Sequence, residues 1–249
     1  MSILICIPTS DNKINFDSMI SLMNLKQILN ENKINLTIIS EVGSLIGRSR
    51  NNLFHKFIKN DEYDYLLFID NDISGFEHSI IPLLKKNNKN NQILGITYAK
   101  KEINDEMLNY DIKNGINNPN RCTKFNLNTL SPPRKIDELL KEIKEKKGFL
   151  NVKHLPTGCL LIPKQTALKM VEKYPDKQYK EYGSEEIKYN LFDSSIYNNR
   201  LLSEDYAFSQ LLLNIGGECV CDAITELKHH GNFIYTGSFI EFLLKKKYK

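Results

Sequence analysis

Short runs of apolar, β-favouring residues recur along residues 1–100, separated by segments in which apolar positions recur at helical spacing. The runs predict buried strands at Ser2–Pro8, Leu36–Ser40 and Tyr65–Ile69. The segments between them predict a helix capped by Asp17 or Ser18 that runs to about Leu29, and a second helix from Arg48 to Ile58. This alternation favours an α/β fold with a Rossmann-like, mostly parallel central sheet flanked by helices.

The same alternation continues less regularly to the end of the chain. It predicts helices over 76–84, 131–147, 165–174 and 203–213, and strands over 92–98, 152–163 and 218–224. The Asn-rich segment 101–131 predicts a loop or a small lobe. The polar, Tyr-rich segment 176–199 predicts a long loop, which suits a sugar-binding rim or is an ordinary connection.

The composition sets limits on the class of protein. The chain has 249 residues, 41% of them hydrophobic, and a net charge of +4. This mild charge does not demand nucleic acid and suits an anionic small substrate. Because no segment has the length of a membrane span and no basic flank precedes Ile3–Pro8, we expect a cytoplasmic protein. The basic end, 245–249, either touches an anionic membrane or is a solvated helix end.

The number and spacing of the cysteines predict that they only pack in the core. Their number is odd and no CxxC pair occurs, so reduced, buried thiols are favoured over disulfides or a zinc site. They are Cys6, Cys122, Cys159, Cys219 and Cys221.

Two carboxylates, Asp70 and Asp72, directly follow the third predicted strand. If strand geometry persists, they lie on one side at the carboxyl end of a strand, where open α/β sheets bind ligands. Such close like charges need a cation, a proton or solvent, and a divalent metal that also holds a diphosphate meets this need. The alternative is a strand that runs into a solvated acidic turn. No GxGxxG or P-loop motif occurs, so a Gly-rich loop is not predicted to hold phosphates.

Two further segments carry charged groups that are candidate site residues. In the first, Lys100 and Lys101 follow the strand predicted at 92–98 and face either a phosphate or solvent. Ser203 is a good helix N-cap, and Glu204 and Asp205 occupy the first turn, where the helix dipole favours anions. They either complete a well-capped helix or supply a general base.

Several segments in order along residues 3–237 together resemble one family. They are Ser44–Asn51, Leu67–Ile73, Tyr98–Lys101, Thr157–Ile162, Leu202–Phe208 and Leu227–Gly231. The chain resembles nucleotide-sugar-dependent glycosyltransferases of the GT-A fold, close to the family-2-like branch of bacteria and large DNA viruses. The resemblance implies one GT-A domain over 1–249, with a nucleotide-binding half (1–100), an irregular or helical lobe (101–150) and an acceptor-side half (151–249).

The resemblance also implies roles for individual residues. Asp72 and His229 would coordinate the metal, Mn²⁺ or Mg²⁺, while Asp70 would reach both the metal and the ribose. In an extended segment His230 would point the opposite way from His229. The nucleotide-sugar, with UDP favoured, would be bound by Pro8, Thr9, Glu41, Arg48, Arg50, Asn51, Asp70, Asn71, Lys100, Lys101 and Gly158. A structural salt bridge is the alternative role for one of the arginines.

The implied activity is metal-dependent transfer of a sugar to an acceptor hydroxyl. Asp205 would be the base of an inverting reaction, with Glu204 as the alternative; in a retaining reaction Asp205 would only position the substrate. The acceptor, whether glycan, protein or lipid-linked, and the oligomeric state stay open. The family's Tyr-Pro-Lys-Lys appears as Tyr98-Ala99-Lys100-Lys101, and Ser209 and Gln210 stand where relatives often have Cys and Arg. The rival functions are a sugar-1-phosphate nucleotidyltransferase and a non-catalytic binding protein of the same fold.

Overall fold

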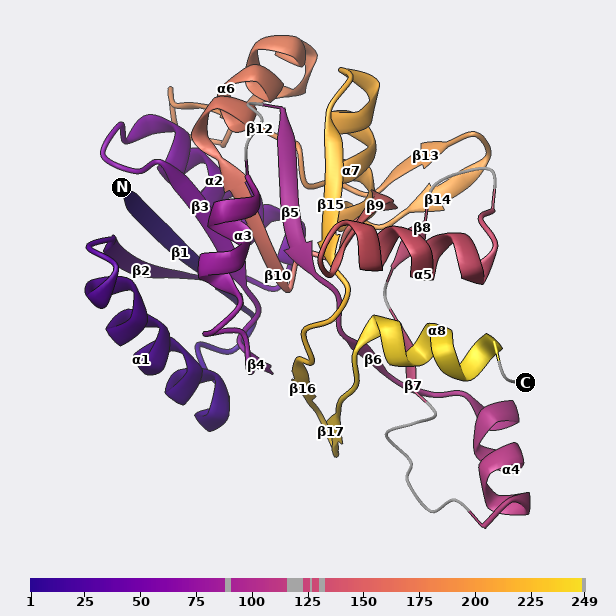
Figure 1. The fold of residues 1–249 in the computed structure, drawn as a ribbon. Coiled ribbons are helices and arrows are strands. Elements are labelled where there is room, and N and C mark those ends of the chain that lie inside the picture. The colour runs from indigo at the N-terminus through magenta and orange to yellow at the C-terminus, as the bar shows by residue number, and fades with distance from the viewer. Residues whose placement is uncertain (88–90, 116–122, 126, 130–132, 248–249) are drawn as a thin grey trace.

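A computed structural model of the chain describes residues 1–87, 91–115, 123–125, 127–129 and 133–247. Its centre is an eight-stranded sheet in the order β2-β1-β3-β10-β5-β15-β9-β8 (Figure 1). All its strands run in one direction except β10 and β9, which pair antiparallel with their neighbours. The Rossmann-like, mostly parallel sheet predicted from the sequence is confirmed. Its strands are β1 (Ser2–Thr9), β2 (Asn35–Val42), β3 (Tyr65–Ile69), β5 (Gln92–Ile96), β8 (Asn128–Thr129), β9 (Phe149–His154), β10 (Cys159–Pro163) and β15 (Glu218–Asp222).

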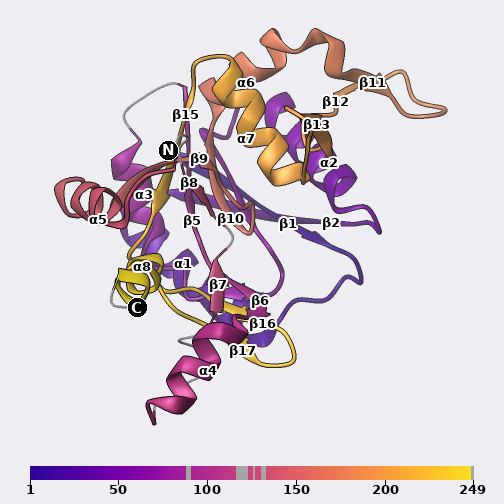
Figure 2. The same ribbon diagram turned by 90° about the vertical axis from the view of Figure 1, so that its right-hand side faces the viewer.

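Helices cover both faces of this sheet (Figures 1 and 2). In β3, Leu66 and Phe68 join one core cluster while Leu67 and Ile69 join the other, because side chains alternate across a strand. The first cluster includes residues of α2 (Ile46–Lys59), α5 (Ile136–Glu145), α6 (Lys164–Lys173), α7 (Glu204–Asn214) and α8 (Phe239–Lys247). The second includes residues of α1 (Phe16–Glu31) and α3 (Ile80–Lys86).

In the part of the chain that the structure describes, short strands form four small sheets outside the central one. A three-stranded sheet joins β4 (Ile73–Ser74), β16 (Lys228–His230) and β17 (Ile234–Tyr235). Two-stranded sheets pair β6 (Ala99–Ile103) with β7 (Thr123–Phe125), β11 (Gln178–Lys180) with β12 (Ile187–Tyr189), and β13 (Ser195–Tyr197) with β14 (Arg200–Leu202). The remaining elements are α4 (Asp105–Lys113) and a 3₁₀ turn, η2 (Pro175–Lys177).

Several predicted elements need correction. Asn15, rather than Asp17 or Ser18, caps α1, since its side chain accepts from the Asp17 amide. The run 152–163 is two strands, β9 and β10, and the helix predicted from residue 76 begins at Ile80. The segment 101–131, predicted as a loop or a small lobe, contains most of β6 and all of α4 and β7. The segment predicted as a long loop contains the hairpin β11–β12 and the strand β13, because short strands are stabilised by partners that local sequence does not reveal.

Other predictions have mixed outcomes. The segment 218–224, predicted as the last strand of the chain, contains β15, but it is not the last strand, because β16 and β17 follow it. The helix start predicted at Ser131-Pro132 and the thiol of Cys122 lie outside the described residues. The four other cysteines are buried and free, as predicted; they are Cys6, Cys159, Cys219 and Cys221.

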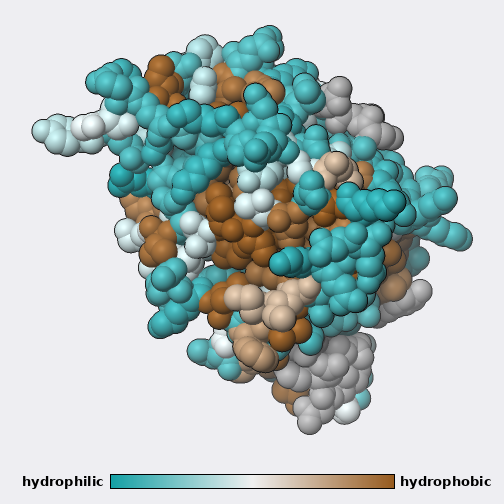
Figure 3. Space-filling model, turned by 90° about the vertical axis from the view of Figure 1, so that its left-hand side faces the viewer, coloured by the Kyte–Doolittle hydropathy of each residue, from teal (hydrophilic) through white to brown (hydrophobic). Residues whose placement is uncertain are grey.

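One face of the molecule carries exposed apolar side chains. They lie on α1 and on the edge strand β2, on the face shown in Figure 3, and include Phe16, Met19, Met23, Ile38 and Val42. Within the described residues, no helix is both long and apolar enough to cross a membrane.

Candidate active site at the ends of the strands

The strand geometry that would place Asp70 and Asp72 on one side does not persist, because β3 ends at Ile69 and the two acids lie in the turn that follows. The turn is closed by a hydrogen bond from the amide of Ile73 to the carbonyl of Asp70. The two carboxylates therefore face different partners. Each partner carries a basic group, which relieves the repulsion between the acids.

Arg50 of α2 is the partner of Asp70. Its side chain is 4% exposed and donates from Nη2 to Asp70 Oδ1 (2.7 Å) and from Nη1 to Glu204 Oε1 (2.6 Å). Burial disfavours its charge, but the two carboxylates outweigh burial and raise the pKa of Arg50. Arg50 thus ties the end of β3 to the first turn of α7, and a salt-bridge role for one of the arginines is borne out.

Lys101 and His229 are the partners of Asp72. Lys101 Nζ lies 2.5 Å from Asp72 Oδ2, and His229 Nε2 lies 3.6 Å from the same oxygen. Burial alone would raise the pKa of Asp72, but hydrogen bonding from His229 and Lys101 outweighs it and lowers the pKa to about 2. Lys101 belongs to β6 and contacts a carboxylate here, whereas the sequence placed it after a strand and facing phosphate or solvent.

The small sheet brings His229 to Asp72. In the antiparallel pairing of β16 with β4, His229 lies opposite Ile73, and the amide of His230 donates to the carbonyl of Asp72 (2.8 Å). His229 Nδ1 lies 2.8 Å from the carbonyl oxygen of Ala99, which leaves Nε2 directed at Asp72. The ring of His230 instead contacts Ser74 Oγ (2.8 Å), so the two histidines point in opposite directions, as strand alternation predicts.

Tyr98 is a site residue that the sequence reasoning missed. It is 6% exposed, its ring packs edge-on against His229 (centroids 5.1 Å apart), and burial followed by the charges of Asp70 and Asp205 raises its pKa. Gly158 makes room for it, because a Cβ at Gly158 would lie 2.5 Å from the Tyr98 hydroxyl oxygen. The carbonyl of Gly158 also accepts from the amide of Asp70 (3.0 Å). The signal available in the sequence was the position of Tyr98 at the start of the motif segment Tyr98–Lys101.

Residues predicted at the nucleotide form a second group near the end of β1. Pro8 and Thr9 are buried there, and Asn71 Nδ2 donates to Thr9 Oγ1 (3.3 Å) and to the Lys13 carbonyl (2.8 Å). Thr9 Oγ1 also lies 3.3 Å from Asp11 Oδ1. The structure therefore brings Pro8, Thr9 and Asn71 together beside the acidic turn.

Other predicted nucleotide ligands are engaged within the protein. Glu41 accepts from Asn52 (3.0 Å) and Lys56 (2.7 Å), and Arg48 donates to Glu181 through Nε and Nη2 (3.2 and 3.0 Å). Asn51 is buried and makes hydrogen bonds to residues 190–192. Lys100 is an exposed side chain of β6.

The two candidate bases have different surroundings. The side chain of Glu204 is 21% exposed and held by Arg50, whereas Asp205 is 7% exposed and accepts from Ser203 Oγ. Ser203 is the N-cap residue of α7, as predicted, but its hydroxyl contacts Asp205 instead of capping the backbone. Both carboxylates lie in the first turn, which the helix dipole favours.

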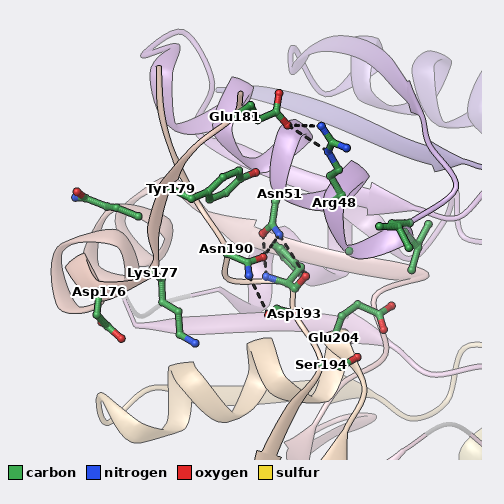
Figure 4. A pocket seen from close by; sticks show the side chains of 15 residues that line it. Arg48, Asn51, Asp176, Lys177, Tyr179, Glu181, Asn190, Asp193, Ser194 and Glu204 are labelled. Carbon is green, nitrogen blue, oxygen red and sulfur yellow. Dashed lines mark hydrogen bonds and ion pairs between the residues drawn. The ribbon is translucent and has the colours of Figure 1, made fainter. Parts of the chain in front are cut away.

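A pocket of about 770 Å³ opens beside Glu204 (Figure 4). Its wall is built from the start of α2, the segments 176–181 and 190–194, and Glu204 itself. The sequence singled out 176–199 for its aromatic and charged composition, with Phe192 and Asp193 inside it, but it assigned a binding role to none of its residues. Tyr179, Glu181, Asn190 and Asp193 are the ones that the structure adds.

The donor set of the predicted metal site is partly assembled. Among the described residues, no group of three His, Cys, Asp or Glu side chains is placed to hold a metal ion. Asp72 and His229 converge, while Asp70 is turned to Arg50. One carboxylate and one imidazole fit Mn²⁺ or Mg²⁺ when phosphate oxygens and water supply the other ligands, and the Ala99 carbonyl orients the imidazole as in known metal sites.

Comparison with known proteins adds a fold likeness. Neither a protein-family model nor a curated protein sequence matches the chain. The structure is similar to the crystal structure of A197 from STIV, with a TM-score of 0.51 and 14% identity over 93% of this chain and 87% of that chain. At this identity the likeness concerns the fold alone.

Proposed function

We propose that the protein is a metal-dependent glycosyltransferase that moves a sugar from a nucleoside-diphosphate sugar to an acceptor hydroxyl. The observation that carries this proposal is the convergence of Asp72 and His229, from distant parts of the chain, with their nearest atoms 3.6 Å apart at the carboxyl end of β3. Ligands bind at this end of open α/β sheets. The resemblance in sequence to GT-A enzymes favours a UDP-sugar as donor.

Asp72 and His229 would hold Mn²⁺ or Mg²⁺, with Asp70 nearby. The metal would supply positive charge to the diphosphate as it leaves the sugar. Lys101 would move from Asp72 toward the phosphates and add to this charge. Arg50 would keep Asp70 in place for the ribose, and Thr9 and Asn71 lie next to that position.

Asp205 is the proposed base of an inverting reaction, and Glu204 is the alternative. Either carboxylate would accept the proton of the attacking hydroxyl. The two are separated by comparing Glu204→Gln with Asp205→Asn under saturating donor. The base is the residue whose amide variant loses turnover by at least 100-fold while its KM for the donor is unchanged.

The proposal is tested by incubating the protein with a panel of nucleotide sugars and Mn²⁺. We expect at least one donor to release its nucleoside diphosphate. The same nucleoside diphosphate should raise the melting temperature of the protein, and EDTA should abolish this stabilisation. Asp72→Ala and His229→Ala should each lose this metal-dependent response. His230→Asn is the matched control, because the His230 ring faces Ser74 and not Asp72.

One observation favours a second candidate, a non-catalytic nucleotide-binding protein. The ammonium of Lys101 already neutralises Asp72, which is the position proposed for the metal. This candidate predicts nucleotide binding that EDTA does not change and that Lys101→Met abolishes. If no nucleotide stabilises the protein against heat, with or without metal, both candidates are excluded.

A further inference from the structure

We propose that the pocket beside Glu204 binds an uncharged oligosaccharide and that this saccharide is the acceptor. The second half of this inference rests on the function proposed above. The first half rests on the pocket alone. Its volume of about 770 Å³ lies within the range of roughly 300–1,000 Å³ that small-molecule sites occupy, and it is large enough for more than one sugar ring.

The position of the pocket connects it with the acidic turn. Glu204 is part of the pocket wall, and Arg50 joins Glu204 Oε1 to Asp70 Oδ1 through a single guanidinium group. Only the side chain of Arg50 therefore separates a ligand hydroxyl bound at Glu204 from Asp70 at the end of β3. Asp72 and His229 lie beyond that strand end, so the pocket and the proposed donor position flank the same buried arginine.

Two acids of the wall are held in ion pairs, and the acids of the wall outnumber its bases. The acids are Asp176, Glu181, Asp193 and Glu204, and the bases are Arg48 and Lys177. Glu181 is paired with both Arg48 (3.0 Å) and Lys188 (3.3 Å), and Glu204 is paired with Arg50 (2.6 Å). Asp193 accepts from the side-chain amide of Asn190 (2.9 Å). This excess of acids would repel a ligand with a large negative charge, whereas hydroxyl groups can donate hydrogen bonds to the carboxylates without adding charge. The wall therefore favours an uncharged, hydroxyl-rich ligand over a phosphate or a polyanion.

The wall also offers the surfaces on which a sugar ring packs. Tyr179 supplies an aromatic ring, and the amides of Gln178 and Asn190 and the hydroxyl of Ser194 supply donors and acceptors. Figure 4 shows Tyr179 and Asn190 on one side of the pocket, with Glu204 and Ser194 at its far end. The negative face of an aromatic ring attracts the C–H groups of a pyranose face.

The pocket is held open by the core beneath it. Asn51 Oδ1 accepts from the amides of Leu191 (3.0 Å) and Phe192 (2.9 Å), and Asn51 Nδ2 donates to Asn190 and to the Phe192 carbonyl. The ring of Phe192 stacks on Phe208 of α7 with centroids 4.1 Å apart. These contacts fix the segment 190–192, so a ligand does not have to order it, and binding costs less conformational entropy.

The experiment measures saccharide binding in EDTA and without nucleotide, by saturation-transfer NMR with cellotriose, maltotriose, chitotriose and mannotriose as probes. We expect at least one trisaccharide to bind, with Tyr179→Ala weakening it by at least tenfold. Tyr182→Ala is the matched control, since this tyrosine of the same hairpin is fully exposed and does not line the pocket. Ser194→Trp, at an exposed position, should fill the pocket and abolish binding.

Three outcomes would overturn the inference. They are binding of none of the trisaccharides, binding that Ser194→Trp leaves unchanged in a folded protein, and preference for tripolyphosphate over the neutral probes. Because neither metal nor nucleotide is present, failure of the donor chemistry does not affect this result. If a saccharide binds the pocket but receives no sugar from any donor, the pocket is still a saccharide-binding site but is not the acceptor site.

Discussion

At the scale of single residues, two acids separated by one residue, Asp70 and Asp72, have different surroundings. Asp70 is held by the buried guanidinium of Arg50, whose geometry is fixed by a second carboxylate, Glu204. Asp72 is more exposed and shares one oxygen between an ammonium and an imidazole. An acid fixed in a buried ion pair suits positioning, whereas an acid beside an oriented imidazole suits exchangeable binding of a cation.

Replacing Arg50 tests how much this ion-pair bridge stabilises the fold. Arg50→Ala leaves two carboxylates without their cation, and removal of one partner from a buried ion pair costs about 3–5 kcal/mol. We expect a loss of unfolding free energy in this range in urea denaturation. Arg50→Lys should recover only part of it, because a single ammonium cannot repeat the two-sided contact.

The triple variant Arg50→Met, Asp70→Asn, Glu204→Gln is the control for this prediction. It removes the charges together, and replacement of a whole buried ion pair is often close to neutral for stability. We expect it to be more stable than Arg50→Ala. If Arg50→Ala costs less than about 1 kcal/mol, the bridge contributes no more than a surface salt bridge does.

His154 predicts a pH dependence of stability. It is 1% exposed, its Nε2 contacts Gln210 (3.1 Å), and burial, with the nearby charge of Lys153, lowers its pKa below the ordinary 6.5 although Gln210 and Asp205 oppose the shift. The unfolded chain therefore binds the proton first as the pH falls. Stability from the neutral ring is complete above pH 6.5 and is lost as the pH falls toward the folded-state pKa.

The measurement compares unfolding free energies at about pH 7.5 and about pH 5.5 for the wild type and for His154→Gln. We expect the wild type to lose more free energy of unfolding than the variant over this interval. His230, whose pKa is also lowered, contributes equally to both proteins. Equal pH dependence of the two proteins would contradict the assignment to His154.

At the scale of elements, the predictions succeeded where the pattern was local. The strands β1, β2 and β3 are continuous apolar runs, and the helices between them have helical spacing, so their order could be predicted. The prediction of a single strand over 152–163 was wrong, because Leu155 and Pro156 are buried like the strands on either side. Hydrophobicity therefore does not mark the turn between β9 and β10. The strands β6 and β7 could not be predicted, because strands of three to five residues are too short to show a clear alternation of apolar and polar side chains.

The link between α2 and the segment 190–192 gives a prediction at this scale. Asn51→Ala would leave the buried amides of Leu191 and Phe192 without their acceptor, and each such group costs about 1–3 kcal/mol. We expect a loss of this order in urea denaturation, together with faster hydrogen exchange at these two amides. Asn52→Ala, one position along α2 and partly exposed, should cost less than about 1 kcal/mol.

At the scale of the whole molecule, the site depends on contacts between distant segments that no local pattern encodes. The sequence could suggest Asp72 and His229 as a pair only through resemblance, and it gave no partner for Arg50. The contact of Lys101 with Asp72 could not be predicted either, because it depends on where β6, paired with β7, lies relative to the acidic turn. Charge neutralisation among groups this far apart in sequence is set by the fold.

The C-terminal helix supports this arrangement from a distance. Phe239 of α8 is 4% exposed and its ring packs on Phe125 of β7, with centroids 5.8 Å apart. β7 pairs with β6, which carries Lys101 and whose Ala99 carbonyl orients His229. α8 therefore holds, through β7 and β6, two of the groups that surround Asp72.

Phe239→Ala should consequently affect both stability and the distant strand. Truncation of a buried Phe costs about 3–5 kcal/mol, and we expect a loss near the lower value because α8 lies at the edge of the core. Below the unfolding transition, hydrogen exchange should accelerate in a peptide spanning 99–103 and stay unchanged in one spanning 65–69. Leu244→Ala, at a 39% exposed position of the same helix, should alter neither quantity by more than a small amount. If exchange at 99–103 in Phe239→Ala stays at the wild-type rate while stability falls, α8 stabilises the fold without supporting β6, and the positioning of Lys101 and His229 is independent of it.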